Sequence, residues 1–206
     1  MSADRLAQVL QRIDQLNRDD PNQERVGGQP QPRELVYSQW LTDWVLRLDP
    51  RASEALRIAA RGQHVRRWTI PRERYERTRK GYLRWRETLK AFHIEQVRGL
   101  MAEAGYPPEL IERVVRIMGK RHLQEEPESQ TLEDALCLVF LERQFEDLRR
   151  KTPEATMLDV LRKTWGKMSE RARAAALQVS LPPESKRFLL DAVSEGTGGI
   201  IGEGKR

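Results

Sequence analysis

The sequence predicts an all-α protein, a single compact helical bundle with no β-sheet. Two observations support this fold class. Apolar residues recur at spacings of three and four along most of the chain, which is the period of a helix with one buried face. No segment alternates apolar and polar residues as a half-buried strand would. With 206 residues, the chain is long enough to bury one substantial core.

The expected organisation has four parts. Residues 1–18 form an N-terminal helix, residues 19–33 a flexible linker, residues 34–193 the helical domain and residues 194–206 a disordered tail. The first part carries its apolar residues at helical spacing: Leu6, Val9, Leu10, Ile13 and Leu16. The linker is rich in proline and glycine, which interrupt helices.

Within the helical domain, Leu41, Trp44, Val45 and Leu48 form the buried stripe of a helix that begins near Glu34. A third helix opens at Ser53, a favoured N-cap residue, and continues to His64. Residues 68–81 show no clear period and predict an irregular basic loop. A long helix follows over residues 82–104.

Four further helices are expected toward the C-terminus. Tyr106-Pro107-Pro108 precedes a helix with proline in its first turn, a position where proline is tolerated. Thr131 is expected to cap a central helix whose apolar run extends from Ala135 to Leu141. Later helices carry Met157 to Met168 and the residues after Pro183.

Composition narrows the class of protein. The longest apolar run has seven residues, far below the roughly 18 that span a bilayer. The N-terminus carries no apolar signal core, and the only cysteine, Cys137, lies inside an apolar run. These features predict a cytoplasmic protein without a membrane partner. The net charge is +6, with eleven Lys/Arg and three Glu between Arg61 and Lys90, which suggests an anionic ligand.

Four polar side chains are predicted to face the interior from four different helices: Glu34, His64, His93 and Asp134. Unpaired buried charges are unfavourable by several kcal/mol, so such groups need partners. Helical bundles assemble metal sites in this way, and a mixed imidazole and carboxylate set suits Mn, Fe, Co, Ni or Zn. The alternative is that each histidine is a hydrogen-bonded core residue and each acid a helix cap.

Four segments carry a resemblance to a known family. They are Ala59–Arg72, Gly81–Arg86, Glu133–Glu142 and Arg162–Ser169. They resemble an uncharacterised domain-of-unknown-function family of bacteria and fungi, from about residue 6 to residue 181. The resemblance implies no particular activity.

A looser similarity connects the chain to the HD-domain metal phosphohydrolases, whose pattern is a histidine, a His-Asp dyad and a distant aspartate. Here Glu34 stands at the first position, Gln63-His64 at the dyad and Asp134 at the last. His93 corresponds to an additional histidine of some members. Both dyad positions differ from the family pattern. The similarity implies an HD-domain-like bundle that hydrolyses a nucleotide or another phosphorylated small molecule.

For that reaction a metal would lower the pKa of bound water while arginines offset charge on the phosphoryl group. The expected phosphate contacts are Arg61, Arg66, Arg67, Arg72, Lys163 and Lys167. Trp68, Tyr82 and Trp85 are expected to stack a base, with a role in the core as the alternative. Glu142 is expected to accept a proton. Two alternatives remain open. One is an RNA or single-stranded nucleic-acid-binding module using the basic stretch, and the other is a noncatalytic anion-binding or protein-binding member.

Overall fold

The computed structural model describes residues 2–119 and 127–194, with side chains from residue 4 onward. The chain divides into two compact units, Met1–Leu132 and Glu133–Arg206, which are considered separately below. Of the predicted disordered tail, residues 195–206 lie outside the described residues, whereas Ser194 is the last residue of a helix. His122, which follows the helix predicted after Pro108, also lies outside them. None of the described helices is long and apolar enough to cross a membrane.

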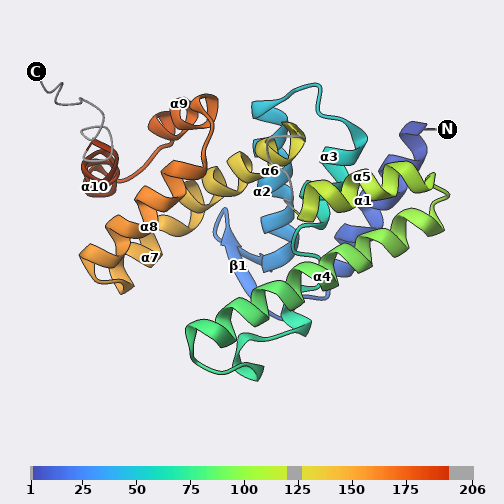
Figure 1. Cartoon of the computed structure of the whole chain (residues 1–206), viewed down its shortest axis with the longest axis horizontal. Coiled ribbons are helices and arrows are strands. Elements are labelled where there is room, and N and C mark those ends of the chain that lie inside the picture. The colour runs from blue at the N-terminus through green and yellow to red at the C-terminus, as the bar shows by residue number, and fades with distance from the viewer. Residues whose placement is uncertain (1, 120–126, 195–206) are drawn as a thin grey trace, which may run out of the picture. The chain divides into compact units, whose positions relative to one another are not determined.

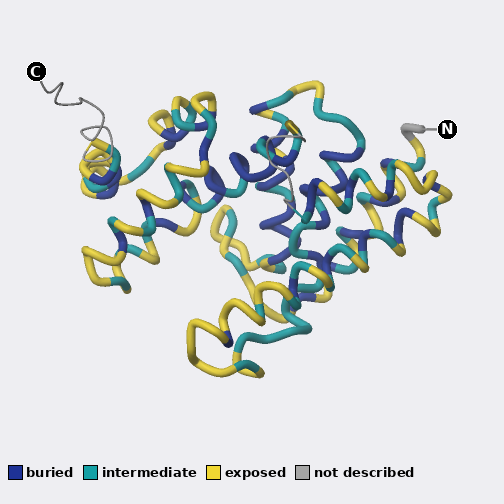
Figure 2. The backbone as a smooth tube through the Cα atoms, in the orientation of Figure 1, coloured by how far each residue is buried: buried dark blue, intermediate teal, exposed yellow. Residues whose placement is uncertain are grey.

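The first unit is built around a short buried helix. Its helices are α1 Ser2–Arg18, α2 Arg33–Leu48, α3 Glu54–Gly62, α4 Arg79–Glu103, α5 Pro108–Gly119 and the start of α6 Pro127–Val139 (Figure 1). Helix α3 packs against α1, α2, α4 and α5, and its middle is dark blue in Figure 2 because Leu56, Ile58 and the alanines beside them are fully buried. Small residues allow the surrounding helices to approach closely. The all-α class is confirmed.

Both ends of α3 are held by specific contacts. At its start, the Ser53 hydroxyl accepts a hydrogen bond from the Leu56 backbone and donates one to Glu128 of α6, at 2.8 Å. This confirms Ser53 as the predicted cap. At its end, Gly62 lies against Val97 of α4 so closely that a Cβ atom would overlap the valine side chain. The helix ends at Gly62 and does not continue to His64, which lies in the turn that follows.

The prediction of no β-sheet was wrong for the segment after α1. Strands β1 Gln23–Val26 and β2 Gln29–Pro32 pair antiparallel, with Val26 opposite Gln29. The two residues between them, Gly27 and Gly28, have φ values of +58° and +82°, as a two-residue hairpin turn requires. The Gly-Gly pair that was interpreted as part of a flexible linker is a hairpin turn.

The described part of the second unit begins with the end of α6. It continues with the π-helical turn η3 Phe140–Gln144, α7 Phe145–Lys151, α8 Glu154–Lys167, α9 Glu170–Gln178 and α10 Pro183–Ser194. Helix α8 packs on α10. The sequence patterns predicted α8 and α10 but did not resolve α7 or α9. Thr131 is not a cap, because α6 already begins at Pro127.

The fit of Gly62 against α4 can be tested with a glycine pair. Gly62→Ala forces a Cβ into the stiff, β-branched Val97 side chain and should lower the free energy of unfolding by about 1–3 kcal/mol. Gly99→Ala is the control. Gly99 lies on α4, the helix that carries Val97, and a Cβ at Gly99 meets nothing within 4 Å. It should raise stability by roughly 0.5–1 kcal/mol. Urea unfolding measures both, and equal effects would contradict the packing argument.

Candidate functional site

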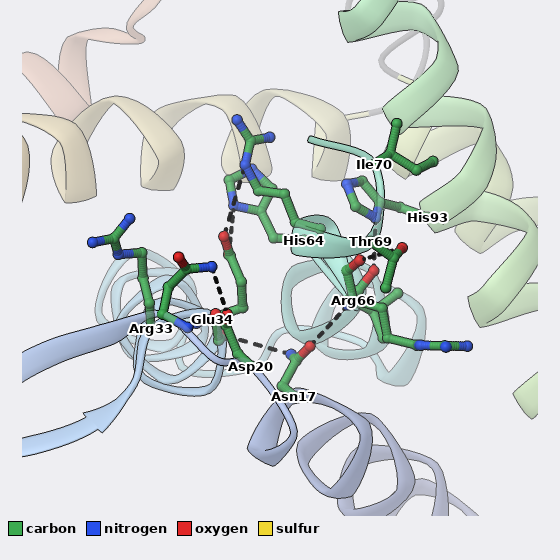
Figure 3. Close-up of polar contacts among 12 residues, drawn as sticks. Asn17, Asp20, Arg33, Glu34, His64, Arg66, Thr69, Ile70 and His93 are labelled. Carbon is green, nitrogen blue, oxygen red and sulfur yellow. Dashed lines mark hydrogen bonds and ion pairs between the residues drawn. The ribbon is translucent and has the colours of Figure 1, made fainter. Parts of the chain in front are cut away.

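Glu34 lies in the first turn of α2 and is almost completely buried. Its backbone N–H donates to Asp20 Oδ2 at 2.9 Å, and its backbone carbonyl accepts from Asn17 Nδ2 at 3.4 Å. Both partners belong to the end of α1 and the residues just after it (Figure 3). These contacts fix the start of α2, so that the carboxylate is directed toward the turn after α3.

His64 occupies that turn and is hydrogen-bonded to the carboxylate. Its Nδ1 lies 3.2 Å from Glu34 Oε2. Its ring stacks on Tyr37, one turn along α2, with the centroids 4.2 Å apart and the planes at 10°. The side chain keeps 21% of its surface exposed, so the imidazole connects a buried carboxyl to solvent.

His93, on α4, completes the group from the opposite side of His64 (Figure 3), with the two ring centroids 5.9 Å apart. Its Nδ1 lies 2.9 Å from the Val65 carbonyl oxygen. Because a carbonyl only accepts, Nδ1 carries the proton and Nε2 of the neutral ring presents a lone pair. That Nε2 is buried and has no hydrogen-bond partner among the described residues.

Burial shifts the acid–base behaviour of this group strongly. It raises the pKa of Glu34 to about 7, against the opposing attraction of Arg67. Burial, together with the neighbouring His64, lowers the pKa of His93 to about 3. It also lowers the pKa of Arg67, while the Glu34 carboxylate opposes that shift. Such perturbed groups cluster at functional sites more often than elsewhere.

Arg66 holds an unusual backbone conformation beside this group. Its φ of 53° makes it the one non-glycine residue with a positive φ in the described chain. Its backbone N–H donates to Asn17 Oδ1 at 3.0 Å, and Asn17 is fully buried. The same asparagine thus supports both Glu34 and the turn that carries His64 and Arg67.

The donor set does not fit the predicted metal. The described residues contain no group of three or more His, Cys, Asp or Glu side chains placed to hold a metal ion. His64 Nδ1 and Glu34 Oε2 are engaged with each other, and the guanidinium Nε of Arg67 lies 3.7 Å from Glu34 Oε1. A cationic neighbour takes the place beside the carboxylate that a metal would need. We therefore assign no step at this site to a metal ion.

Three of the four predicted metal ligands come together, and the fourth has another partner. Asp134 is fully buried, and its carboxylate accepts from the Ser169 backbone N–H at 2.8 Å and from the Ser169 hydroxyl. Ser169 is the N-cap of α9, through its hydroxyl and Ala172 N. Asp134 therefore supports a helix start within the second unit, which is the capping alternative that the sequence left open.

The other polar residues predicted in the second unit form ion pairs with near neighbours. Lys163 pairs with Asp159 at 2.6 Å, and Lys167 with Glu133 at 3.6 Å. The predicted proton acceptor, Glu142, lies in the π-helical turn η3 and contacts Arg143 at 3.3 Å.

The four predicted phosphate-binding arginines differ in their partners. Arg61 pairs with Asp14 at 2.9 Å, and Arg66 donates to Gln96 at 3.3 Å. Arg72 is used internally, donating to the carbonyl oxygens of the loop that follows it. Arg67 differs from these three. Its Nε contacts Glu34, and its guanidinium carbon lies 4.8 Å from the ring centroid of Trp85. The Arg67 side chain is 28% exposed.

The three aromatic residues predicted to stack a base differ in their exposure and contacts. Trp68 is half-buried in the turn η1 Arg67–Thr69, whereas Tyr82 is 43% exposed on α4. Trp85 is also on α4, and its Nε1 donates to the Ile70 carbonyl at 2.9 Å.

Sequence reasoning missed Asn17 and Asp20, which position Glu34 and Arg66. Both are polar residues at the end of a helix, where a solvated side chain is the usual outcome, and nothing in the periodicity marks them as buried. Asn17 stands one residue after Leu16, the last apolar position of the predicted first helix. Its side chain bonds to the Glu34 carbonyl and the Arg66 N–H, which lie far along the chain, and helical periodicity does not reveal such contacts.

Comparison with known protein families shows a match for most of the chain. The model of a family described as Domain of unknown function (DUF4202) matches residues 7–189. The chain belongs to this family. No curated protein and no solved structure matches the chain. The predicted family membership is confirmed, and the similarity to HD-domain phosphohydrolases stays a prediction.

The raised pKa of Glu34 predicts a pH-dependent stability. The folded carboxyl has a pKa of about 7 against 4.5 for the ordinary group. Stability from its protonated form is therefore complete below pH 4.5 and is lost as the pH rises toward 7. Relative to the parent, Glu34→Gln should gain about 3 kcal/mol across this range. Urea unfolding at several pH values measures the difference, and a flat difference would contradict the shift.

The support of Arg66 by Asn17 predicts opposite effects of two variants. Arg66→Gly keeps the backbone hydrogen bond to Asn17 and removes the strain of a positive φ, so the free energy of unfolding should rise or stay unchanged. Asn17→Ala leaves the Arg66 N–H without its acceptor and should lower it by about 1–3 kcal/mol. Chemical denaturation measures both, and a destabilising Arg66→Gly would show that the arginine side chain, not its backbone, matters.

Proposed function

We propose that the protein hydrolyses a phosphorylated small molecule or nucleotide at the site formed by Glu34, His64 and Arg67. The observation that carries the proposal is the pairing of a buried carboxyl with a partly exposed imidazole, 3.2 Å apart, beside a guanidinium that has a single described ion pair. A carboxyl that titrates near neutral pH exchanges protons readily at physiological pH.

The roles follow from the position of the imidazole. His64 Nδ1 faces Glu34, and in the proposed reaction Nε2 accepts the proton of a water molecule as the water oxygen bonds to phosphorus. The imidazolium then returns that proton to the leaving oxygen as the P–O bond breaks, while Glu34 holds or takes the proton on Nδ1. Arg67 contacts Glu34 through Nε, which leaves its two terminal nitrogens to bind phosphoryl oxygens bidentately. Tyr37 keeps the imidazole in plane by stacking on it.

His93 supports this arrangement from the buried side. Its neutral ring lies next to His64, and its Nε2 lone pair lacks a protein donor. An unsatisfied buried acceptor is unfavourable, and a water molecule or a substrate hydroxyl would satisfy it.

The proposal places this chemistry in the cytoplasm, since the buried Cys137 is a free thiol, as is usual in a reducing compartment.

The test is a phosphate-release assay on nucleoside mono-, di- and triphosphates and simple phosphomonoesters. His64→Gln should lower turnover of the accepted substrate by about 10²-fold or more, and Arg67→Lys should raise KM more than it lowers kcat, because lysine loses the bidentate contact. Arg98→Gln, which removes a surface ion pair between α4 and Glu112 of α5, is the control and should leave turnover unchanged.

Two outcomes would overturn the proposal. One is that no member of the panel is turned over, and the other is that His64→Gln retains the parental rate. Turnover should also survive a chelator such as EDTA, since the described donors do not form a metal site. A chelator-sensitive rate that one divalent ion restores would show that the acid–base assignment is wrong.

A further inference from the structure

A second surface of the first unit carries cations that the Glu34 site does not use. It comprises residues 74–84, which form the loop before α4 and the first turns of that helix; it is called here the basic tip. Five cations project from it: Arg74, Arg77, Arg79, Lys80 and Arg84. All five are exposed, and the tip is mostly yellow in Figure 2. In Figure 1 the same segment extends beyond the helices around α3.

These five side chains have no described intramolecular partner. None takes part in an ion pair or side-chain hydrogen bond with the described residues, although Glu73 and Glu76 lie in or beside the same loop. Several cations elsewhere on the surface do have such partners: Arg98 with Glu112, Arg150 with Glu146 and Lys163 with Asp159. The basic tip therefore presents uncompensated positive charge.

Two of the cations oppose the electrostatics of their own helix. Arg79 and Lys80 occupy the first turn of α4, at the positive end of the helix dipole, and that turn has no acidic residue. Among the described α-helices this is an exception, since the others have an acid in the first turn, as at Glu54 of α3 and Glu170 of α9. Cations at this position destabilise a helix. Residues that break a local stability rule are expected at functional sites.

The loop that carries the cations is held in place by internal contacts. The Arg72 guanidinium donates to the carbonyl oxygens of Tyr75 at 2.8 Å and Glu76 at 2.6 Å. Gly81 packs against the Glu76 carbonyl so closely that no side chain fits between them. Thr78 caps α4 by accepting from the Gly81 N–H at 3.0 Å. The five cations thus project from an ordered platform.

The same tip exposes apolar surface. Tyr82 is 43% and Leu83 52% exposed. The Tyr82 hydroxyl accepts from Arg86 at 3.3 Å, and its ring centroid lies 5.9 Å from that of Trp85, which is anchored to the loop through the Ile70 carbonyl. Tyr82 therefore offers a supported aromatic ring next to unpaired arginines.

We propose that the basic tip binds single-stranded nucleic acid. Four of the five cations are arginines, whose planar guanidinium groups match phosphate oxygens bidentately. An exposed tyrosine among them supplies a platform for an unpaired base, as in sequence-tolerant strand-binding proteins. An anionic membrane would favour a broad apolar helix face, whereas this tip exposes only two large apolar side chains among the described residues. An acidic protein would not use the aromatic ring as a stacking platform.

The test is fluorescence anisotropy with labelled single-stranded RNA and DNA of mixed sequence, together with the matching duplexes, across a range of salt concentrations. Single strands should bind more tightly than duplexes. The logarithm of the association constant should fall with the logarithm of salt concentration with a slope of about −3 to −4, as expected for five phosphate contacts. Comparison of the RNA and DNA strands identifies which of the two the tip prefers.

Two sets of variants separate charge from stacking. Neutralising the tip with five Gln substitutions, Arg74→Gln, Arg77→Gln, Arg79→Gln, Lys80→Gln and Arg84→Gln, should abolish binding and its salt dependence. The control neutralises five exposed cations elsewhere, again four Arg and one Lys: Arg51→Gln, Arg116→Gln, Arg171→Gln, Arg187→Gln and Lys151→Gln. It changes the net charge equally and should retain the slope. Tyr82→Ala should weaken binding about 5- to 150-fold with an unchanged slope.

The proposal is overturned if the neutralised tip still binds, if the control loses binding equally, or if Tyr82→Ala has no effect. It is also overturned if polyglutamate or phosphatidylserine vesicles bind at the tip and oligonucleotides do not. Circular dichroism checks that each variant keeps its helices. The readout is independent of the Glu34 site, because phosphate release and strand binding are measured separately on the same variants.

Discussion

The buried side chain of Asn17 is the constraint on which the candidate site depends. Its amide donates to the Glu34 carbonyl and its oxygen accepts from the Arg66 N–H, so one residue at the end of α1 positions both the start of α2 and the turn after α3. Asp20 adds a second contact by accepting from the Glu34 N–H. Helix hydrogen bonds satisfy neither the Glu34 N–H, in the first turn of α2, nor the Arg66 N–H. The side chains of Asp20 and Asn17 that accept from them therefore determine where the carboxyl and the imidazole meet.

This arrangement keeps a carboxyl in an environment that disfavours its charge. Glu34 would be stabilised as an anion by Arg67 alone, yet burial outweighs that attraction and the pKa rises to about 7. If Glu34 served only to form an ion pair with Arg67, its pKa would be expected to lie well below 7, so that the carboxylate is charged at neutral pH. Retaining an acid at the point where it titrates, in hydrogen-bond contact with a partly exposed imidazole, is understandable as proton-transfer chemistry.

Helical periodicity was sufficient to predict most of the first unit, and inward-facing polar residues were sufficient to identify Glu34, His64 and His93. The period fails where residues act through hydrogen bonds to the backbone instead of through packing. Asp134 has the same pattern as Glu34, inward on a helix, but its carboxylate caps α9, a helix whose alanine-rich sequence gave no strong stripe. The hairpin was missed for a related reason, since its strands are short and polar, and only Gly27 and Gly28 mark the turn.

Charge was the least informative feature at the level of sequence and becomes informative with partners assigned. The stretch from Arg61 to Lys90 reads as uniformly basic, yet the structure separates it into two kinds of arginine. Arg61 and Arg72 are used inside the fold, the first with Asp14 and the second with carbonyl oxygens. Arg72 in turn holds the loop from which unpaired cations project. Ordering the Arg72 side chain in the loop lowers its conformational entropy, which is unfavourable. We expect such an arginine where the loop presents charge in a defined arrangement, since a loop that is only solvated does not need to be ordered.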